Sequence, residues 1–164
     1  MSERATIESP HFRTVMGHLP TGVSIAAAST PHGPAGLVVG SFMSVSLDPP
    51  LIAISPALTS SSWPAIREAG HFCVNVLSEH QEDLARRFAV SGGDKFAGVD
   101  WRPGRSGSPV LAGAVSWIDC RLHSEEVAGD HWLVLGEVLE LDIGSGHEPL
   151  IFHRGSFDRI RQAS

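Results

Sequence analysis

Residues 33–55 read GPAGLVVGSFMSVSLDPPLIAIS, and this stretch decides the fold. An apolar strand is followed by small residues, a second strand, an Asp-Pro-Pro turn at 48–50 and a third strand. Gly36, Gly40 and Ser41 have short side chains or none, which leaves backbone N–H groups open to a flat ligand. The same glycines are also compatible with simple bends or bulges in a barrel. The stretch predicts consecutive strands of one sheet that a planar ligand can approach.

Further strand patterns lie on both sides of this stretch. They cover residues 23–28, 72–77, 115–127, 132–143 and 150–153. Gly129-Asp130 separates the two longest of these strands, so they are expected to form a hairpin. The glycine-rich segments 92–93 and 98–107 are expected to be loops. About six or seven strands predict a mainly β domain with a mostly antiparallel, barrel-like sheet.

Three short helices are expected beside this sheet. Ser9 can cap the first helix through its side-chain oxygen, and Pro10 is favourable in the first turn that follows. Ser60 or Ser62 is expected to cap the second helix. The third is predicted to start at Ser78, since Gln81 follows three residues later in a capping box.

Composition and charge argue against several classes of protein. The chain has 164 residues, which suits one domain over 1–164 with an ordered core at about 10–158 and a loose tail at 1–8. Its net charge is −6 and it has no cluster of Lys or Arg, which argues against binding nucleic acid. No apolar run reaches the ~18 residues of a membrane span, and the polar start, MSERATIESP, lacks the apolar part of a signal peptide. A cytoplasmic protein without membrane contact is expected.

Common catalytic motifs are missing from the sequence. There is no GxSxG, HExxH or GxxxxGK[ST] motif, and no GxGxxG follows a strand. The absence of GxGxxG excludes only the Rossmann way of holding a nicotinamide dinucleotide. The histidines have no metal-binding spacing, so no metal site is expected. Cys73 and Cys120 form no CxxC motif and are expected to be buried, reduced thiols.

Six segments nevertheless occur in the order and spacing of a known family. They are FRTVMG at 12–17 with TGV at 21–23; GLVVGSFMSVS at 36–46 with DPP at 48–50; FCVNVL at 72–77; RFA at 87–89 with DKFAG at 94–98; GDH at 129–131 with GEV at 136–138; and PLIF at 149–152, continuing through Gly155. On these segments the chain resembles the short-chain flavin reductases, the reductase components of two-component flavin-dependent monooxygenases.

This resemblance implies a fold, an activity and partners. The fold is a split β-barrel of the FMN-binding type, mainly β with short flanking helices. The activity is transfer of hydride from NADH or NADPH to FMN or FAD, and the reduced flavin is passed to a separate monooxygenase. Such reductases are homodimers, with the flavin at or near the subunit interface.

The resemblance also implies roles for residues of this sequence. The residues of the segment 36–46 that lie against the edge of the isoalloxazine ring in this family are Val38, Val39, Gly40 and Ser41. Residues that match the phosphate-binding part are Ser55, Thr59, Ser60 and Ser62, together with the start of the following helix. Residues that contact the phosphate or the tail of the flavin are Arg87, Phe88 and Lys95. His131 faces the flavin on the nicotinamide side and is expected to position the nicotinamide or its phosphates.

The chain departs from the family pattern at four positions in these segments or beside them. Val38 and Gly40 stand where side chains often bond the ring, and Leu58 and Ser61 stand where Lys or Arg is common. Losing one charge-assisted hydrogen bond costs about 1.5–3 kcal/mol, so weaker flavin binding or a different flavin is expected.

Three functions therefore stay open at this point. The chain is a flavin reductase, a non-catalytic split-barrel protein that binds flavin or another planar ligand, or a flavoenzyme that keeps its flavin. The simpler interpretations of the residues also stay open. The hydroxyl run 59–62 could be only a helix cap. Arg87 and His131 could be ordinary surface residues.

Overall fold

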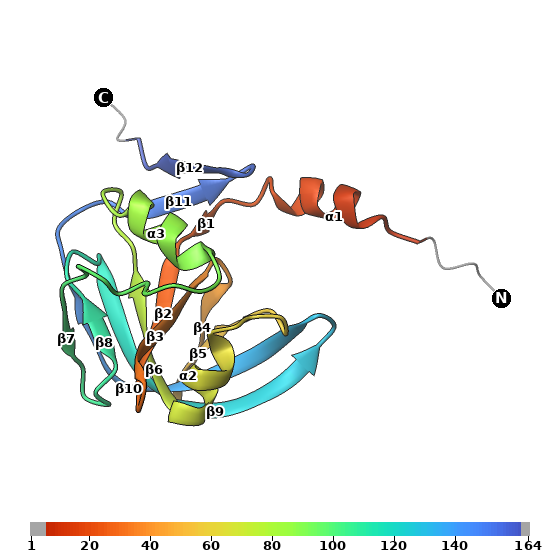
Figure 1. Cartoon of the computed structure of the whole chain (residues 1–164). Coiled ribbons are helices and arrows are strands. Elements are labelled where there is room, and N and C mark those ends of the chain that lie inside the picture. Colours follow the sequence, from red (N-terminus) through yellow and green to blue (C-terminus); the bar gives the residue numbers. More distant parts are fainter. Residues whose placement is uncertain (1–5, 162–164) are drawn as a thin grey trace.

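The computed structural model describes residues 6–161, so most of the tail expected at 1–8 lies outside the described residues. The three helices are α1 (Ser9–Met16), α2 (Trp63–Ala69) and α3 (Glu82–Ala89) (Figure 1). The strands are β1 (Thr21–Gly22), β2 (Ser24–Thr30), β3 (Gly33–Val39), β4 (Phe42–Leu47), β5 (Pro50–Ile54), β6 (His71–Val76), β7 (Trp101–Pro103), β8 (Pro109–Leu111), β9 (Ser116–Ala128), β10 (His131–Ile143), β11 (Leu150–His153) and β12 (Ser156–Arg159). The predicted mainly β fold with short helices is confirmed.

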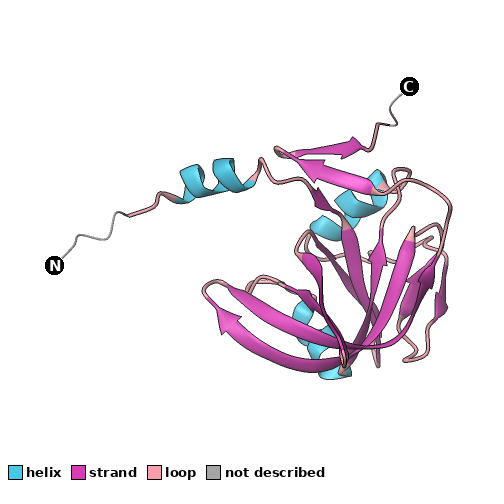
Figure 2. Cartoon of the chain, turned by 180° about the vertical axis from the view of Figure 1, so that it is seen from behind, coloured by secondary structure: helices cyan, strands magenta, loops and turns pink. Residues whose placement is uncertain are grey.

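Seven strands form one antiparallel sheet in the order β3-β2-β6-β9-β10-β5-β4. Figure 2 shows these strands curled around a common interior. The two edge strands, β3 and β4, follow each other directly in the chain but do not pair with each other. The sheet is therefore an open, split β-barrel, and its split lies inside the motif 33–55, between β3 and β4.

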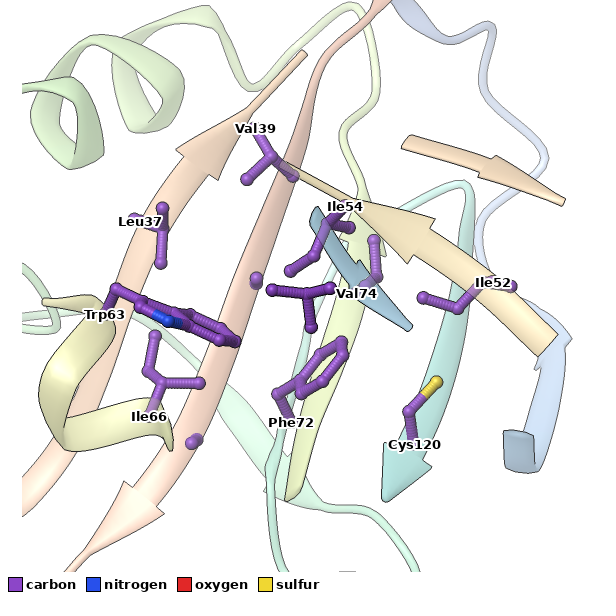
Figure 3. Packing of buried hydrophobic residues seen from close by; sticks show 12 residues of the cluster. Leu37, Val39, Ile52, Ile54, Trp63, Ile66, Phe72, Val74 and Cys120 are labelled. Carbon is purple, nitrogen blue, oxygen red and sulfur yellow. The ribbon is translucent and has the colours of Figure 1, made fainter. Parts of the chain in front are cut away.

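The interior of the barrel is filled by one apolar cluster. Figure 3 shows the Trp63 ring between Leu37 and Ile66, with Phe72 beside it. The rings of Trp63 and Phe72 meet edge to face, with their centroids 6.2 Å apart. A second cluster, which includes Ile25, packs β2 against α3 on the other face of the sheet. Alternating residues of β2 serve the two clusters, because side chains alternate across a strand.

Four short strands were missed by the sequence analysis. The predicted loop at 98–107 is wrong in part, because β7 pairs with β8 in a small hairpin. A separate sheet has the order β1-β11-β12, and of these three strands only the one near 150–153 was expected. Strands of two to four residues are too short for alternation to show in a sequence, and their pairing depends on distant partners.

All three helix starts can be compared with the capping predictions. The prediction for Ser9 is wrong, because Ser9 is the first residue of α1 and the N-cap position is Glu8, which makes no side-chain capping bond. The backbone N–H of Trp63 donates to Ser60 Oγ at 3.2 Å, so Ser60 supports the start of α2. The predicted start of α3 at Ser78 is wrong, since the helix begins at Glu82. Gln81 still reaches back to the N–H of Ser78 at 3.0 Å, but the N–H of Gln81 bonds to the carbonyl of Ser78 in a turn. The capping contact therefore closes a turn that precedes the helix.

The expected hairpin and thiols are both present. β9 and β10 pair along their lengths, and Gly129 takes a positive φ of 66° in the turn between them. Cys73 and Cys120 are free and buried, in clusters on opposite faces of the sheet. Burial raises the pKa of the Cys120 thiol to about 12 and raises the pKa of Cys73 as well. In residues 6–161, no helix is long and apolar enough to cross a membrane.

Candidate functional site

A cleft of about 480 Å³, here called the main cleft, opens at the split of the barrel. The end of β3, the loop after β5, the end of α3 and the start of β10 contribute its walls. The structure brings together every predicted site residue except Arg87. These residues are Val38, Val39, Gly40, Ser41, Ser55, Thr59, Ser60, Ser62, Phe88, Lys95 and His131. The wall also includes residues that were not predicted, among them Leu37, Pro56, Ala57, Ala89 and Ser91. Their side chains are small or apolar, so no sequence motif marked them as binding residues.

The corner between β3 and β4 is fixed by a reciprocal pair of hydrogen bonds. The N–H of Ser55 donates to Ser41 Oγ at 3.0 Å, and this hydroxyl donates to the carbonyl of Ser55 at 3.3 Å. The hydroxyl of Ser55 in turn donates to the carbonyl of Trp132 at 2.8 Å. Both hydroxyls therefore hold the walls of the cleft in place, and Val39 and Gly40 lie beside Ser41 in the same wall.

The hydroxyl run 59–62 forms one side of the main cleft. Ser60 is used by the start of α2, and Ser62 Oγ lies 3.4 Å from Lys95 Nζ. Within the described residues, the hydroxyls of Thr59 and Ser61 have no hydrogen-bond partner in the protein. These two hydroxyls can bond an oxygen-rich ligand, as a phosphate-binding segment requires.

Lys95 supplies positive charge to the cleft. Its ammonium lies 3.2 Å from the carbonyl of Phe88 and 3.4 Å from the carbonyl of Gly36. Burial lowers the pKa of Lys95. Among the described residues that line the main cleft, Lys95 is the one Lys or Arg. An anion bound here would therefore depend on this single cation and on the neighbouring hydroxyls.

His131 is held at the edge of the cleft by its neighbours in the chain. The N–H of Trp132 donates to the carbonyl of Pro56, and the N–H of Leu58 donates to the carbonyl of Asp130. These bonds tie the start of β10 to the loop after β5. His131 Nδ1 lies 2.6 Å from Asp130 Oδ1, and this hydrogen bond lowers the pKa of the Asp130 carboxyl. The imidazole is thus oriented by a carboxylate and half exposed, ready to contact a ligand.

Arg87 does not reach the main cleft. It lies in the last turn of α3, and its guanidinium donates to the carbonyl of Ala97 at 2.8 Å. It borders a different surface hollow, which includes Asp83 and Val99. The structure therefore gives Arg87 a role in holding the loop after α3 and places it apart from the other predicted site residues.

The four departures from the family pattern occupy different places. Val38 and Gly40 line both the main cleft and a neighbouring apolar cavity of about 290 Å³, which Phe152 and Phe157 close. Ser61 lines the main cleft, whereas Leu58 is 42% exposed and does not. A Cβ at Gly40 would meet only Thr21 Oγ1, at 3.4 Å, so this glycine keeps the cleft wide rather than relieving a clash.

The residues of the main cleft fit a flavin. The open backbone beside Gly40 can approach a planar ring, and Thr59, Ser61 and Lys95 can bond a phosphate on the far side. Residues 6–161 contain no group of His, Cys, Asp or Glu side chains that could hold a metal ion. The hydroxyls of Thr59 and Ser61 and the ammonium of Lys95 suit the cleft to an anionic organic ligand.

Comparisons with known proteins agree with this chemistry. The model of the flavin reductase like domain family matches residues 16–161. A flavin reductase of Pseudomonas putida is 49% identical over 155 residues, which cover 94% of this chain and 91% of that protein. HsaB of Rhodococcus jostii, the reductase subunit of a flavin-dependent monooxygenase, is 44% identical over 94% of this chain and 79% of its own.

A solved structure extends the similarity to the fold. The NADH:FAD oxidoreductase SgcE6 of Streptomyces globisporus, in complex with NAD and FAD fragments, has a TM-score of 0.87 and 36% identity. The match covers 96% of this chain and 98% of that one. By its sequence and its fold, the chain belongs to the flavin reductase like domain family.

Proposed function

We propose that the protein is an NAD(P)H-dependent flavin reductase that transfers hydride from NADH or NADPH to FMN or FAD. The observation that carries this proposal is the main cleft, which gathers an open backbone corner, free hydroxyls, one lysine and a histidine at the split of the barrel. The relatives named flavin reductase and NADH:FAD oxidoreductase support the same activity. By analogy with the HsaB reductase subunit, the reduced flavin goes to a separate monooxygenase.

The chemistry makes few demands on side chains. A bound flavin accepts hydride at N5 when the nicotinamide C4 lies at about van der Waals distance, ~3.5 Å. The protein holds the two rings in this geometry. The backbone N–H groups of the Gly40 corner face the ring edge, where negative charge builds on reduction. Lys95 and the free hydroxyls hold the phosphate, and His131 at the cleft edge bonds the nicotinamide dinucleotide.

The test is NAD(P)H oxidation, followed by nicotinamide absorbance, with FMN, FAD or riboflavin added in turn. Rapid turnover that depends on added flavin supports the reductase. Turnover without added flavin, by protein that purifies with its flavin bound, supports a flavoenzyme that reduces another substrate. Folded protein that binds flavin but oxidises neither nucleotide contradicts the proposal, and a flavin-binding protein without turnover then accounts for the cleft.

Replacing His131 by Ala is expected to raise the KM for NADH about fivefold, because one hydrogen bond to the dinucleotide is lost. The KM for flavin should change by less than about twofold, since Lys95 and the hydroxyl run remain. Steady-state kinetics with each substrate varied in turn measure both values. His123→Ala is the matched control, because His123 is exposed on β9 and lines no part of the cleft. An unchanged KM for NADH in His131→Ala contradicts the role given to this residue.

We further propose that the protein works as a homodimer. Helix α1 projects from the barrel in Figure 1 and has no buried residue. Phe12, Val15 and Met16 are 56%, 54% and 48% exposed on this helix, with Leu19 just beyond it. An apolar helix face of this kind is stable in water when another surface covers it, and a second copy is the partner that the resemblance implies. The two free cysteines support a cytoplasmic location.

The double variant Phe12→Ser with Val15→Ser is expected to shift the protein from dimer to monomer, because two apolar contacts are lost from the covered face. Light scattering after size-exclusion chromatography measures the mass over a dilution series. His11→Ser is the control, since His11 is an exposed polar neighbour on the same helix. A double variant that keeps the mass of the parent protein contradicts the use of α1 in the interface.

A further inference from the structure

A second cavity, of about 310 Å³, continues the main cleft on the far side of Lys95. The two cavities share Ser61, Ser62 and Lys95 in their walls. The second cavity is otherwise bounded by the start of β3, by α2 and by the loop 92–96. Because the shared residues include the cation and a free hydroxyl, a ligand anchored in the main cleft by its phosphate can extend directly into the second cavity.

The walls of the second cavity differ in chemistry from those of the main cleft. Pro34, Ala35 and Ala65 offer small apolar surfaces that suit the face of an aromatic base. Gly92 and Gly93 form a turn in the cavity wall, where both have a positive φ. As glycines, they have no side chains that would narrow the cavity. Asp94 accepts a hydrogen bond from the N–H of Phe96 at 3.1 Å through Oδ1. Its carboxylate has no other hydrogen bond within the described residues, so it can accept one from a sugar hydroxyl.

FMN and FAD bring about the same total charge to the shared wall. The terminal phosphate of FMN carries a charge near that of other phosphomonoesters, about −1.5 to −2 at pH 7. The same charge in FAD is divided between two linked phosphates of about −1 each, as neither has a second ionisable proton. Lys95 is the one Lys or Arg among the described residues lining either cavity, and Arg87 is bonded to Ala97. A single cation between the cavities faces about the same total charge in both flavins, so the preference rests on the space that the second cavity offers to adenosine.

We propose that the second cavity is the adenosine site of FAD, with the diphosphate beside Lys95, and that the protein prefers FAD to FMN. This rests on the proposed function and makes the identity of the flavin specific. The adenine ring lies against Ala35 and Ala65, and a ribose hydroxyl donates to Asp94. The isoalloxazine ring stays in the main cleft, beside Gly40.

The wild-type protein tests this preference without any substitution. The KM for FAD is expected to be at least about tenfold below the KM for FMN, at saturating NADH or NADPH. The dissociation constants, measured by quenching of flavin fluorescence, should differ in the same direction. Equal values for the two flavins, or tighter FMN, overturn the adenosine site and leave the reductase standing. No oxidation of either nucleotide with any flavin overturns the proposed function instead, and the two dissociation constants still test the adenosine site.

A variant that fills the second cavity locates the preference. Ala65 lines this cavity and not the main cleft, so Ala65→Trp should raise the KM for FAD about tenfold and change that for FMN by less than about twofold. Ala65→Leu should act in the same direction with a smaller change, and it is the variant to use if the indole impairs folding. Glu68→Trp is the control, because Glu68 is exposed on α2 and lines neither cavity. Equal losses for both flavins, or no loss for FAD, overturn the proposal.

Discussion

The substitution Gly40→Trp is expected to abolish flavin binding and, with it, flavin-dependent NADH oxidation. Gly40 lies at the corner between β3 and β4, in the wall of the main cleft. An indole at this position takes the space beside the backbone where the ring must lie. We expect the dissociation constant for flavin to rise by at least about a hundredfold, which corresponds to about 2.7 kcal/mol. Titration of flavin fluorescence measures the change, and a normal titration curve contradicts the placement of the ring.

Two controls separate the size of the indole from other effects. Gly40→Ala should bind flavin within about twofold of the parent, since a Cβ there has only an ordinary 3.4 Å contact with Thr21 Oγ1. Gly146→Trp adds the same indole to a loop position with open space around it. All three variants should unfold within about 2 °C of the parent, because neither glycine is in a strained conformation or a tight contact. A large loss of stability in Gly40→Trp would assign its effect to folding.

The long elements of the fold could be predicted from the sequence because their signals are local. β9 and β10 have 13 residues each, with apolar residues two positions apart such as Ile118 and Cys120, and Gly129-Asp130 marks the turn between them. β1 has only two residues and exists because it pairs with β11, more than a hundred positions away. β7 and β8 contain prolines and three residues each, so neither shows a strand pattern by itself. Their formation depends on pairing partners that a local pattern does not reveal.

The site was predictable to a similar degree, and for a related reason. The resemblance to a family named residues that the structure brings together in the main cleft, because motif order survives where individual side chains vary. It did not reveal that the hydroxyls of Ser41 and Ser55 bond the protein itself. It also did not reveal that Arg87 turns toward Ala97. In both cases the side chain bonds a backbone group from another segment of the chain. The folded barrel brings these segments together, so the partner cannot be identified from the local sequence.

The apolar stripe of α1 shows a further limit of sequence patterns. Phe12, Val15 and Met16 are spaced as on one face of a helix, and the structure places them on α1. Periodicity identifies a face that must be covered, but it does not say whether the same chain covers it. In this protein the barrel does not, because α1 has no buried residue, so the pattern adds nothing to the core.

Replacing Trp63 by Ala is expected to destabilise the folded barrel strongly. Trp63 is 2% exposed and packs between Leu37, Ile66 and Phe72 in the interior of the barrel. Removing a buried aromatic ring of this size costs about 3–5 kcal/mol, since the neighbours do not collapse into the space. For a chain of this length the melting temperature should fall by roughly 6–20 °C. Thermal and urea unfolding measure the loss, and a change under about 1 kcal/mol contradicts the packing described.

The variant Trp63→Phe shows whether the aromatic ring or the indole N–H accounts for the contribution of Trp63 to the free energy of unfolding. Trp63 Nε1 is buried and has no hydrogen-bond partner among the described residues, so its loss removes a polar group that gains nothing from burial. We therefore expect Trp63→Phe to cost much less than Trp63→Ala, at about 1–2 kcal/mol for the smaller ring. The backbone N–H of residue 63 keeps its bond to Ser60 in both variants. Any weakening of flavin binding in Trp63→Ala must then come from a loosened start of α2, which directly follows the hydroxyl run 59–62 in the wall of the main cleft.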